Sequence, residues 1–245
     1  MTTIAPPTRS CDAQDLVIAH QAFRRVYSLA PDAVRCTDPA DRTRVGSIAS
    51  TLKAVNAALH HHHTVEDTML WDTLAERRPA CGLHVELMKR QHGTVAALLA
   101  RAPELIRAWR RHPGRATAEP LAALFAEIGD VLEVHLAAEE ARIVPVIEQV
   151  INAAEWQKVG NAATAVTAPR QGFLMLGLIY DLMPAEERAA FDAELPGPVT
   201  FVWALVGRHM YERMMTNLRH SEPAGLRGTG HTLRPQQDSN LRHKV

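Results

Sequence analysis

The sequence lacks net charge: its 245 residues include 27 lysines and arginines and 27 aspartates and glutamates. Without a broad basic field, sequence-independent binding of nucleic acid is not expected. Long apolar runs are also missing, since the two longest, residues 173–180 and 199–206, fall far short of the ~20 residues that cross a bilayer. We therefore expect neither a nucleic-acid partner nor a membrane-spanning segment.

Cysteine is scarce as well, with only Cys11, Cys36 and Cys81 and no CxxC pair. An odd number of widely spaced cysteines argues against a disulfide framework and against a thiolate zinc site, and it fits a reducing compartment. The N-terminal segment MTTIAPPTRS has no apolar core of the kind that a signal peptide needs. The expected location is the cytoplasm.

Strand signals are few, whereas apolar residues recur at spacings of three and four among many Ala, Leu, Arg and Glu residues. This pattern predicts an all-α fold. Prolines and glycines divide the first part of the chain into four long helices. The first is expected over residues 12–30, ended by Pro31, and the second over 38–78, with Asp38 as N-cap and Pro39 in the first turn. The third runs from residue 83 to the break at Pro113 and Gly114, and Pro103 bends or ends it. The fourth is expected over 117–150, and Pro145 distorts its last turns.

A second, smaller helical region is expected over residues 152–220, after a first unit of residues 12–150. Asn152 can cap its first helix, and Glu155 completes a capping box. Its helices are predicted over residues 153–167, 170–183, 184–193 and 197–219, separated by prolines. The tail from Ser221 has little apolar content. Residues 221–245 are therefore expected to be disordered, as are residues 1–11.

Histidine is abundant, with 13 residues, and its positions are informative once the apolar stripe of each helix is written out. In the second helix the stripe contains His62 and Glu66, and in the fourth helix it contains His135 and Glu139. Residues four apart project from the same helix face. Each pair would therefore lie side by side where the core needs apolar side chains.

The other two helices each add one histidine to the same core: His20 on the first and His92 on the third. A single core histidine is usually a hydrogen-bonded structural residue, but six polar groups that include two carboxylates need another explanation. An unpaired carboxylate costs several kcal/mol to bury. Because a cation removes both this cost and the repulsion between the carboxylates, the pattern predicts a metal site.

Four imidazoles and two carboxylates, without a thiolate, suit iron or manganese, and suit zinc less specifically. Six protein ligands exceed what one tetrahedral zinc ion takes. They suffice for two metal ions that share the glutamates as bridges.

These segments resemble the hemerythrin-like (HHE cation-binding) family. The resemblance covers residues 12–150 and rests on His20 in DLVIAHQAFRR and on HHHHTVEDTMLWDTL, LMKRQHGTV and HLAAEEARIVPVI. It implies an up-down four-helix bundle with two iron ions, Fe2+ or Fe3+, joined by an oxo- or hydroxo-bridge. The ligands that it implies, in the order H–HxxxE–H–HxxxE of a bacterial branch, are His20, His62, Glu66, His92, His135 and Glu139.

The chain departs from the oxygen-carrying members of that family. They have a second histidine on the third helix where this chain has Met88, and an aspartate on the fourth helix where it has Glu140. One histidine fewer leaves an open coordination site. This favours sensing or peroxide chemistry over reversible oxygen carriage.

Several residues beside the pattern have two interpretations each. His63 could support a neighbouring ligand or replace one, and Asp67 and Glu140 could face solvent or orient a histidine. His60 and His84 are expected at the surface.

The leading hypothesis is a di-iron protein that binds, senses or detoxifies dioxygen, hydrogen peroxide or nitric oxide. If the protein is an enzyme, the expected reaction is peroxide decomposition. Two alternatives are iron homeostasis without turnover and a helical interaction module whose metal is structural or absent. The methionines of region 153–220 are expected to fill gaps in its core, and the alternative is a surface for a second copy or another protein.

Overall fold

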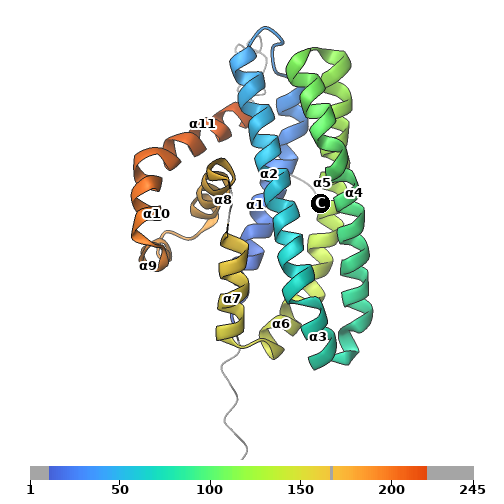
Figure 1. Ribbon diagram of the computed structural model, residues 1–245, viewed down its shortest axis with the longest axis vertical. Coiled ribbons are helices and arrows are strands. Elements are labelled where there is room, and N and C mark those ends of the chain that lie inside the picture. The colour runs from blue at the N-terminus through green and yellow to red at the C-terminus, as the bar shows by residue number, and fades with distance from the viewer. Residues whose placement is uncertain (1–10, 166–167, 220–245) are drawn as a thin grey trace, which may run out of the picture.

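The computed structural model describes residues 11–165 and 168–219, and all regular elements in this part of the chain are helices. The predicted all-α fold is confirmed. Four long helices lie side by side and are connected alternately at opposite ends of a bundle (Figure 1). Their bounds are Gln14–Arg35 for α1, Arg42–Met69 for α2, Gly82–Arg111 for α4 and Arg115–Arg142 for α5. In this ring α1 packs against α5, α5 against α4, α4 against α2, and α2 against α1.

Apolar stripes that face inward on all four helices hold the bundle together. On α2 the stripe includes Leu52, Val55 and Leu59, and on α5 it includes Phe125 and Ile128, all of them without exposed surface. Burying one such side chain contributes roughly 1.5–3 kcal/mol. The predicted burial of these stripes, including their polar positions, is confirmed.

Two prolines lie inside helices that the sequence suggested they would end or bend. α1 continues past Pro31 to Arg35, so the predicted end at residue 30 is wrong. Ala33 and Val34, which follow the proline, are completely buried, and their packing offsets the hydrogen bond that proline cannot donate. Pro103 likewise lies within α4, which does not end there.

The start of α2 also differs from the prediction. Its N-cap is Asp41, whose carboxylate accepts a hydrogen bond from the N–H of Arg44 at 2.9 Å. Asp38, the predicted N-cap, instead accepts from the N–H of Ala40 at 2.9 Å and stabilises the preceding turn.

The two helices that carry a His-x-x-x-Glu pair both end just beyond it. α2 stops before Leu70, so the predicted uninterrupted helix over residues 38–78 is wrong. α5 stops before Ile143, close to Pro145, which was predicted to distort the last turns of the helix over residues 117–150. The short helices that follow are α3 (Trp71–Arg77) and α6 (Val144–Val150). Pro145 accounts for the second break, because in a continuous helix its ring would clash with a carbonyl of the preceding turn. No proline explains the break at Leu70.

Shorter helices pack outside the bundle, where α8 and α11 cover α1 and α2 and α7 covers α2 (Figure 1). The remaining elements are η1 (Pro79–Cys81), α7 (Ala153–Thr164), α8 (Pro169–Leu182), α9 (Arg188–Glu194), α10 (Gly197–Val202), a π-helical turn (Trp203–Gly207) and α11 (Arg208–Arg219). The predicted capping box of Asn152 and Glu155 is confirmed. The helix predicted over residues 197–219 is interrupted by the π-helical turn, and the one predicted over 184–193 begins later.

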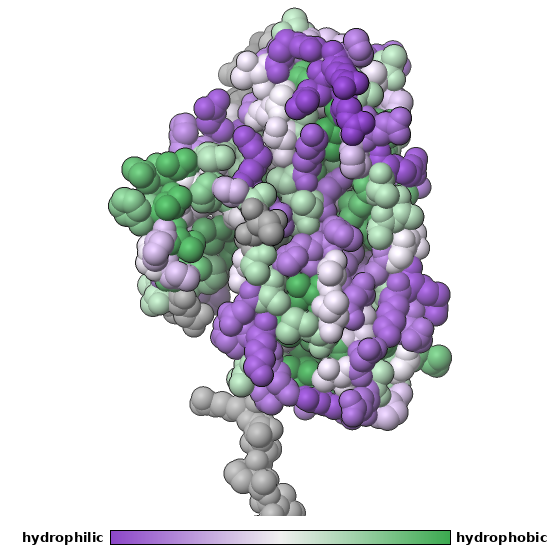
Figure 2. All heavy atoms as spheres, viewed as in Figure 1, coloured by the Kyte–Doolittle hydropathy of each residue, from purple (hydrophilic) through white to green (hydrophobic). Residues whose placement is uncertain are grey.

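The surface differs between the bundle and this outer layer. Figure 2 shows hydrophilic side chains over much of the bundle and a hydrophobic area beside α9 and α10. Its exposed apolar residues are Val199, Phe201, Val202, Leu205 and Val206. None of the described helices has both the length and the apolar character to cross a membrane. The segments predicted to be disordered lie outside the described residues, except Cys11, which is buried.

Candidate metal centre

Seven polar side chains converge in the middle of the bundle, and each is at most 9% exposed. Every long helix contributes at least one of them. They are His20 on α1; His62, His63 and Glu66 on α2; His92 on α4; and His135 and Glu139 on α5. The structure thus brings together all six residues that the sequence singled out and adds His63.

These side chains form two groups. In the first group, one ligand atom each of His20, His62 and Glu66 lies within 4.8 Å of the others. In the second group the same holds for His63, His92 and His135. We call them the first and the second histidine group.

Within the second group the ring nitrogens face one another closely. The Nε2 atoms of His92 and His135 are 3.2 Å apart, and the ring of His63 stacks on that of His92 with a centroid distance of 4.0 Å. When both rings carry the proton on Nδ1, the two Nε2 lone pairs repel each other at this distance, whereas a proton on one Nε2 makes a hydrogen bond to the other. A cation bound by both nitrogens removes this repulsion.

The two glutamates each reach both histidine groups. The carboxylate of Glu66 lies 3.1 Å from His62 Nε2 and 3.5 Å from His92 Nε2. Glu139 Oε2 lies 3.6 Å from His20 Nε2 and 3.5 Å from His135 Nε2. Each carboxylate is therefore close to histidines of both groups.

Several of the converging atoms have no hydrogen-bond partner among the described residues. They are Nε2 of His20, His62 and His63, and both carboxylate oxygens of Glu66 and Glu139. The two carboxyl groups can bond to each other only if one of them carries a proton. Leaving a buried polar atom unpaired costs about 1–3 kcal/mol, and more for a charge. Metal coordination satisfies all of these atoms, so the residues fit bound cations.

Burial sets the charges of these groups when no cation is present. It lowers the pKa of His62 and His63 well below the usual value and that of His135 to about 3, so these rings are neutral near pH 7. Burial raises the pKa of Glu139, and burial together with the charge of Glu139 raises the pKa of Glu66 well above the usual value. Neutral imidazole is the form that binds metal.

Outer hydrogen bonds hold three of the histidines. The Nδ1 atom of His92 lies 2.7 Å from Asp67 Oδ1, and that of His20 lies 3.0 Å from Glu140 Oε1. His135 Nδ1 lies 3.3 Å from the side-chain oxygen of Gln91. A hydrogen bond donated by Nδ1–H to each of these oxygens leaves the Nε2 atoms bare toward the core. Asp67 and Glu140 thus contact histidines of neighbouring helices.

The sequence left the role of His63 open between supporting a neighbouring ligand and replacing one, and the structure shows that its side chain is buried. His62 and His63 are 9% and 5% exposed, so both face inward. The signal was present in the helical period, because an inward face of about 100° takes residues at spacings of three and four from Leu59 and therefore includes both positions. His60 is exposed, as predicted, and the half-buried His84 belongs to neither histidine group.

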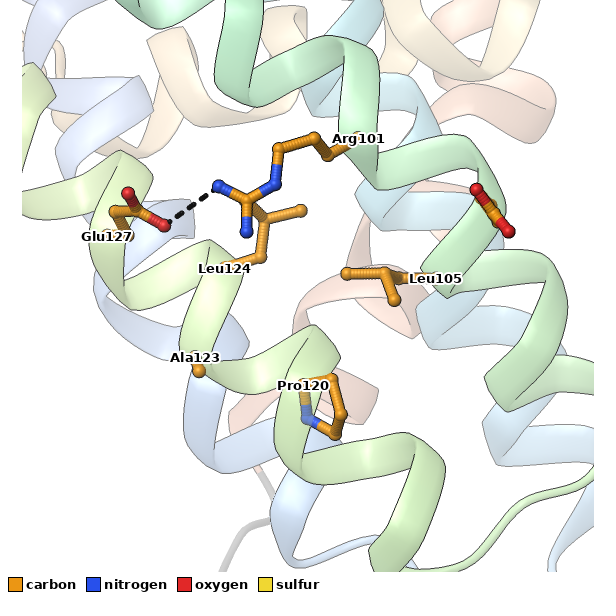
Figure 3. Close-up of a pocket in the computed structure, with 7 residues that line it drawn as sticks. Arg101, Leu105, Pro120, Ala123, Leu124 and Glu127 are labelled. Carbon is orange, nitrogen blue, oxygen red and sulfur yellow. Dashed lines mark hydrogen bonds and ion pairs between the residues drawn. The ribbon is translucent and has the colours of Figure 1, made fainter.

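One surface hollow of the described part lies between α4 and α5, and Figure 3 shows it with its Arg101–Glu127 ion pair of 3.1 Å. Glu127 precedes His135 by eight residues on α5, which is about 12 Å along a helix. The hollow is therefore separate from the histidine groups, and we assign it no role.

Comparison with known proteins gives one match. Residues 12–147, more than half of the chain, match the family model described as hemerythrin HHE cation binding domain. The searches of curated proteins and of solved structures found no match.

Proposed function

Because the chain belongs to the family of hemerythrin HHE cation-binding domains, we propose that its bundle holds two iron ions, one at each histidine group. We propose further that this centre binds, senses or detoxifies dioxygen, hydrogen peroxide or nitric oxide. The observation that supports the proposal is the convergence of seven buried ligand side chains whose inward-facing atoms include seven without a hydrogen-bond partner among the described residues.

The first ion would be held by His20 and His62, and the second by His63, His92 and His135, with Glu66 and Glu139 shared. Imidazole and carboxylate ligands without thiolate suit iron or manganese, and suit zinc less specifically, and the resemblance to the hemerythrin-like family favours iron. Three histidines at one position and two at the other would make the two ions chemically different. When bound, iron supplies redox chemistry and an open position for a small oxygen or nitrogen ligand.

The chain itself would exclude water and large molecules from the centre. The ring of Phe23 lies 5.2 Å from that of His62, and the ring of Trp71 lies 5.5 Å from that of His92. Met88, where oxygen-carrying members have a further histidine, is completely buried and adds apolar surface. Such an enclosure favours small ligands such as dioxygen, peroxide or nitric oxide.

Metal analysis with absorption spectroscopy tests the proposal. We expect about two irons per chain and a near-ultraviolet band that changes on adding peroxide or azide, since iron suits these ligands. The variant His63→Gln should lose one of the two ions, whereas His60→Gln, an exposed neighbour on the same helix, should keep both. A colourless protein that stays free of iron after anaerobic loading with Fe2+ would contradict the proposal.

Turnover is tested separately, because binding and catalysis are different claims. If the centre detoxifies peroxide, the iron-loaded protein should decompose it faster than the same concentration of free iron. Equal rates would leave binding or sensing, or iron homeostasis without turnover. The variant His135→Ala should remove both the band and any turnover.

A further inference from the structure

Each inward-facing glutamate is followed in the chain by a second carboxylate that reaches a histidine of another helix. Asp67 follows Glu66 on α2 and contacts His92 of α4, with 2.7 Å between Oδ1 and Nδ1. Glu140 follows Glu139 on α5 and contacts His20 of α1, with 3.0 Å between Oε1 and Nδ1. The side chains of Asp67 and Glu140 are 45% and 26% exposed, so they lie at the rim of the core. The two halves of the bundle therefore use the same arrangement.

The two arrangements differ in what binds the outer carboxylate. Glu140 receives two hydrogen bonds from the Arg24 guanidinium, at 2.6 and 3.2 Å, so its charge is compensated by a cation. Asp67 receives a hydrogen bond of 2.7 Å from the indole N–H of Trp71, which carries no charge. Lys89, which pairs with Asp72 at 3.0 Å, acts on Asp67 only at longer range. Of these two carboxylates, the one behind His92 thus has the less compensated negative charge, because no cation is hydrogen-bonded to it.

We propose that Asp67 and Glu140 are positioning residues that hold His92 and His20 with Nδ1 protonated and Nε2 bare toward the core, and that Asp67 strengthens metal binding at its position more than Glu140 does at the other. The second part rests on the proposed two-metal centre. The physical reason is that a carboxylate acceptor makes the coordinated imidazole a stronger base. A neighbouring guanidinium withdraws part of this effect, since the carboxylate charge is shared with it.

The first experiment uses the metal-free protein and does not depend on the metal. The ring nitrogen signals of histidine, labelled with nitrogen-15, report which nitrogen carries the proton. We expect His20 and His92 to be protonated at Nδ1. The variant Asp67→Ala should remove this preference at His92 and leave His20 unchanged. The control Asp32→Ala changes a 72% exposed side chain that pairs with Arg35, away from both histidine groups, and should change neither signal. A wild-type His92 protonated at Nε2 would overturn the positioning role.

The second experiment measures Zn2+ affinity by competition with a chromophoric chelator. The variant Asp67→Asn should lower the affinity for one of the two Zn2+ ions about 10–100-fold, the range typical when a hydrogen-bond partner of a metal ligand is removed. The variant Glu140→Gln should lower the affinity for the other ion by a smaller factor. The control Glu127→Gln changes a half-exposed side chain that pairs with Arg101 at 3.1 Å, and neither residue belongs to a histidine group. It should leave both affinities unchanged.

The outcomes separate the two proposals. A wild-type protein that binds fewer than two Zn2+ ions contradicts the two-metal centre, whatever the protonation of the histidines. Two ions with equal weakening by Asp67→Asn and Glu140→Gln contradict only the unequal contribution. Circular dichroism of each variant shows whether the helices are retained. A variant that unfolds is replaced by Asp67→Ser or Glu140→Ser, and the same comparison applies.

Discussion

At the scale of single residues, the glutamates of the core are the groups that favour metal most strongly. Glu139 has no exposed surface, and neither of its oxygens accepts a hydrogen bond from the described histidines or backbone. Burying a charged group without a partner costs free energy, so this carboxyl group lowers the stability of the metal-free protein. Stability and metal binding are therefore opposed at this position.

The variant Glu139→Met tests this opposition. Methionine is unbranched, of similar length and without polar hydrogen-bonding groups, so the metal-free protein should gain about 1–3 kcal/mol in its free energy of unfolding, as seen when buried ionic groups are replaced by apolar ones. The increase in melting temperature that Zn2+ produces in the wild type should be reduced or lost. Urea denaturation with and without Zn2+ measures both. Glu127→Met, on the same helix but half exposed in an ion pair with Arg101, is the control. A less stable metal-free variant would contradict the prediction.

At the scale of elements, the short helices at one end of the bundle pack against one another and against the long helices in a shared apolar cluster. α3 and α6 follow the breaks after α2 and α5, and Trp71, Leu74 and Ile147 from these helices are completely buried in one apolar cluster. α7 joins this cluster through Trp156. The link between α3 and α7 also includes an ion pair at the surface.

This ion pair predicts a pH dependence. Arg77 donates hydrogen bonds of 2.7 Å to both oxygens of Glu155, and these bonds, with the backbone N–H of Asn152, lower the pKa of Glu155 to about 2. The unfolded value is about 4.3. Because the folded pKa is the lower one, the stabilisation is complete above pH 5 and is lost as the pH falls from about 4.3 to 2.

The variant Glu155→Gln measures this contribution, since glutamine keeps the capping geometry and removes only the charge. Near pH 7 the free energy of unfolding of the wild type should exceed that of the variant by less than about 1 kcal/mol, because the ion pair is exposed to solvent and screened by salt. The difference should vanish near pH 2. Denaturant unfolding at several pH values gives both numbers, and a difference that grows toward low pH would contradict the assignment.

At the scale of the whole molecule, the outer helices share the core of the bundle. Leu174 and Leu178 of α8 and Met214 and Leu218 of α11 belong to the same buried cluster as the stripes of α1 and α2. The outer layer therefore contributes to the stability of the helices that carry His20 and the histidine-rich segment of α2.

Gly177 shows how closely α8 and α11 approach. A Cβ atom at this position would lie 2.2 Å from Cγ of Tyr211, which is buried. The variant Gly177→Ala should therefore destabilise the protein by about 1–3 kcal/mol, the usual effect of overpacking. Gly160→Ala on α7 is the control, since nothing lies within 4 Å of its added Cβ; it should stabilise the helix by up to about 1 kcal/mol. Equal stability of the two variants in urea would show that α11 can move away from α8.

Local periodicity determined the helices and the inward polar positions from the sequence alone. Residues three and four apart share a helix face whatever surrounds them, so spacing along the chain was enough to assign the six polar positions to the core. These are His20, His62, Glu66, His92, His135 and Glu139. The capping box of Asn152 and Glu155 is equally local, and it was predicted for the same reason.

Only the tertiary structure decided which of these groups meet. The pairing of Asp67 with His92 and of Glu140 with His20 joins residues 25 and 120 positions apart, and such contacts depend on how each helix is rotated in the bundle. The inward position of His63 depends on the same rotation, because it lies at the edge of the apolar stripe. The continuation of α1 past Pro31 followed packing against other helices, which outweighs local propensity when the neighbouring side chains are fully buried.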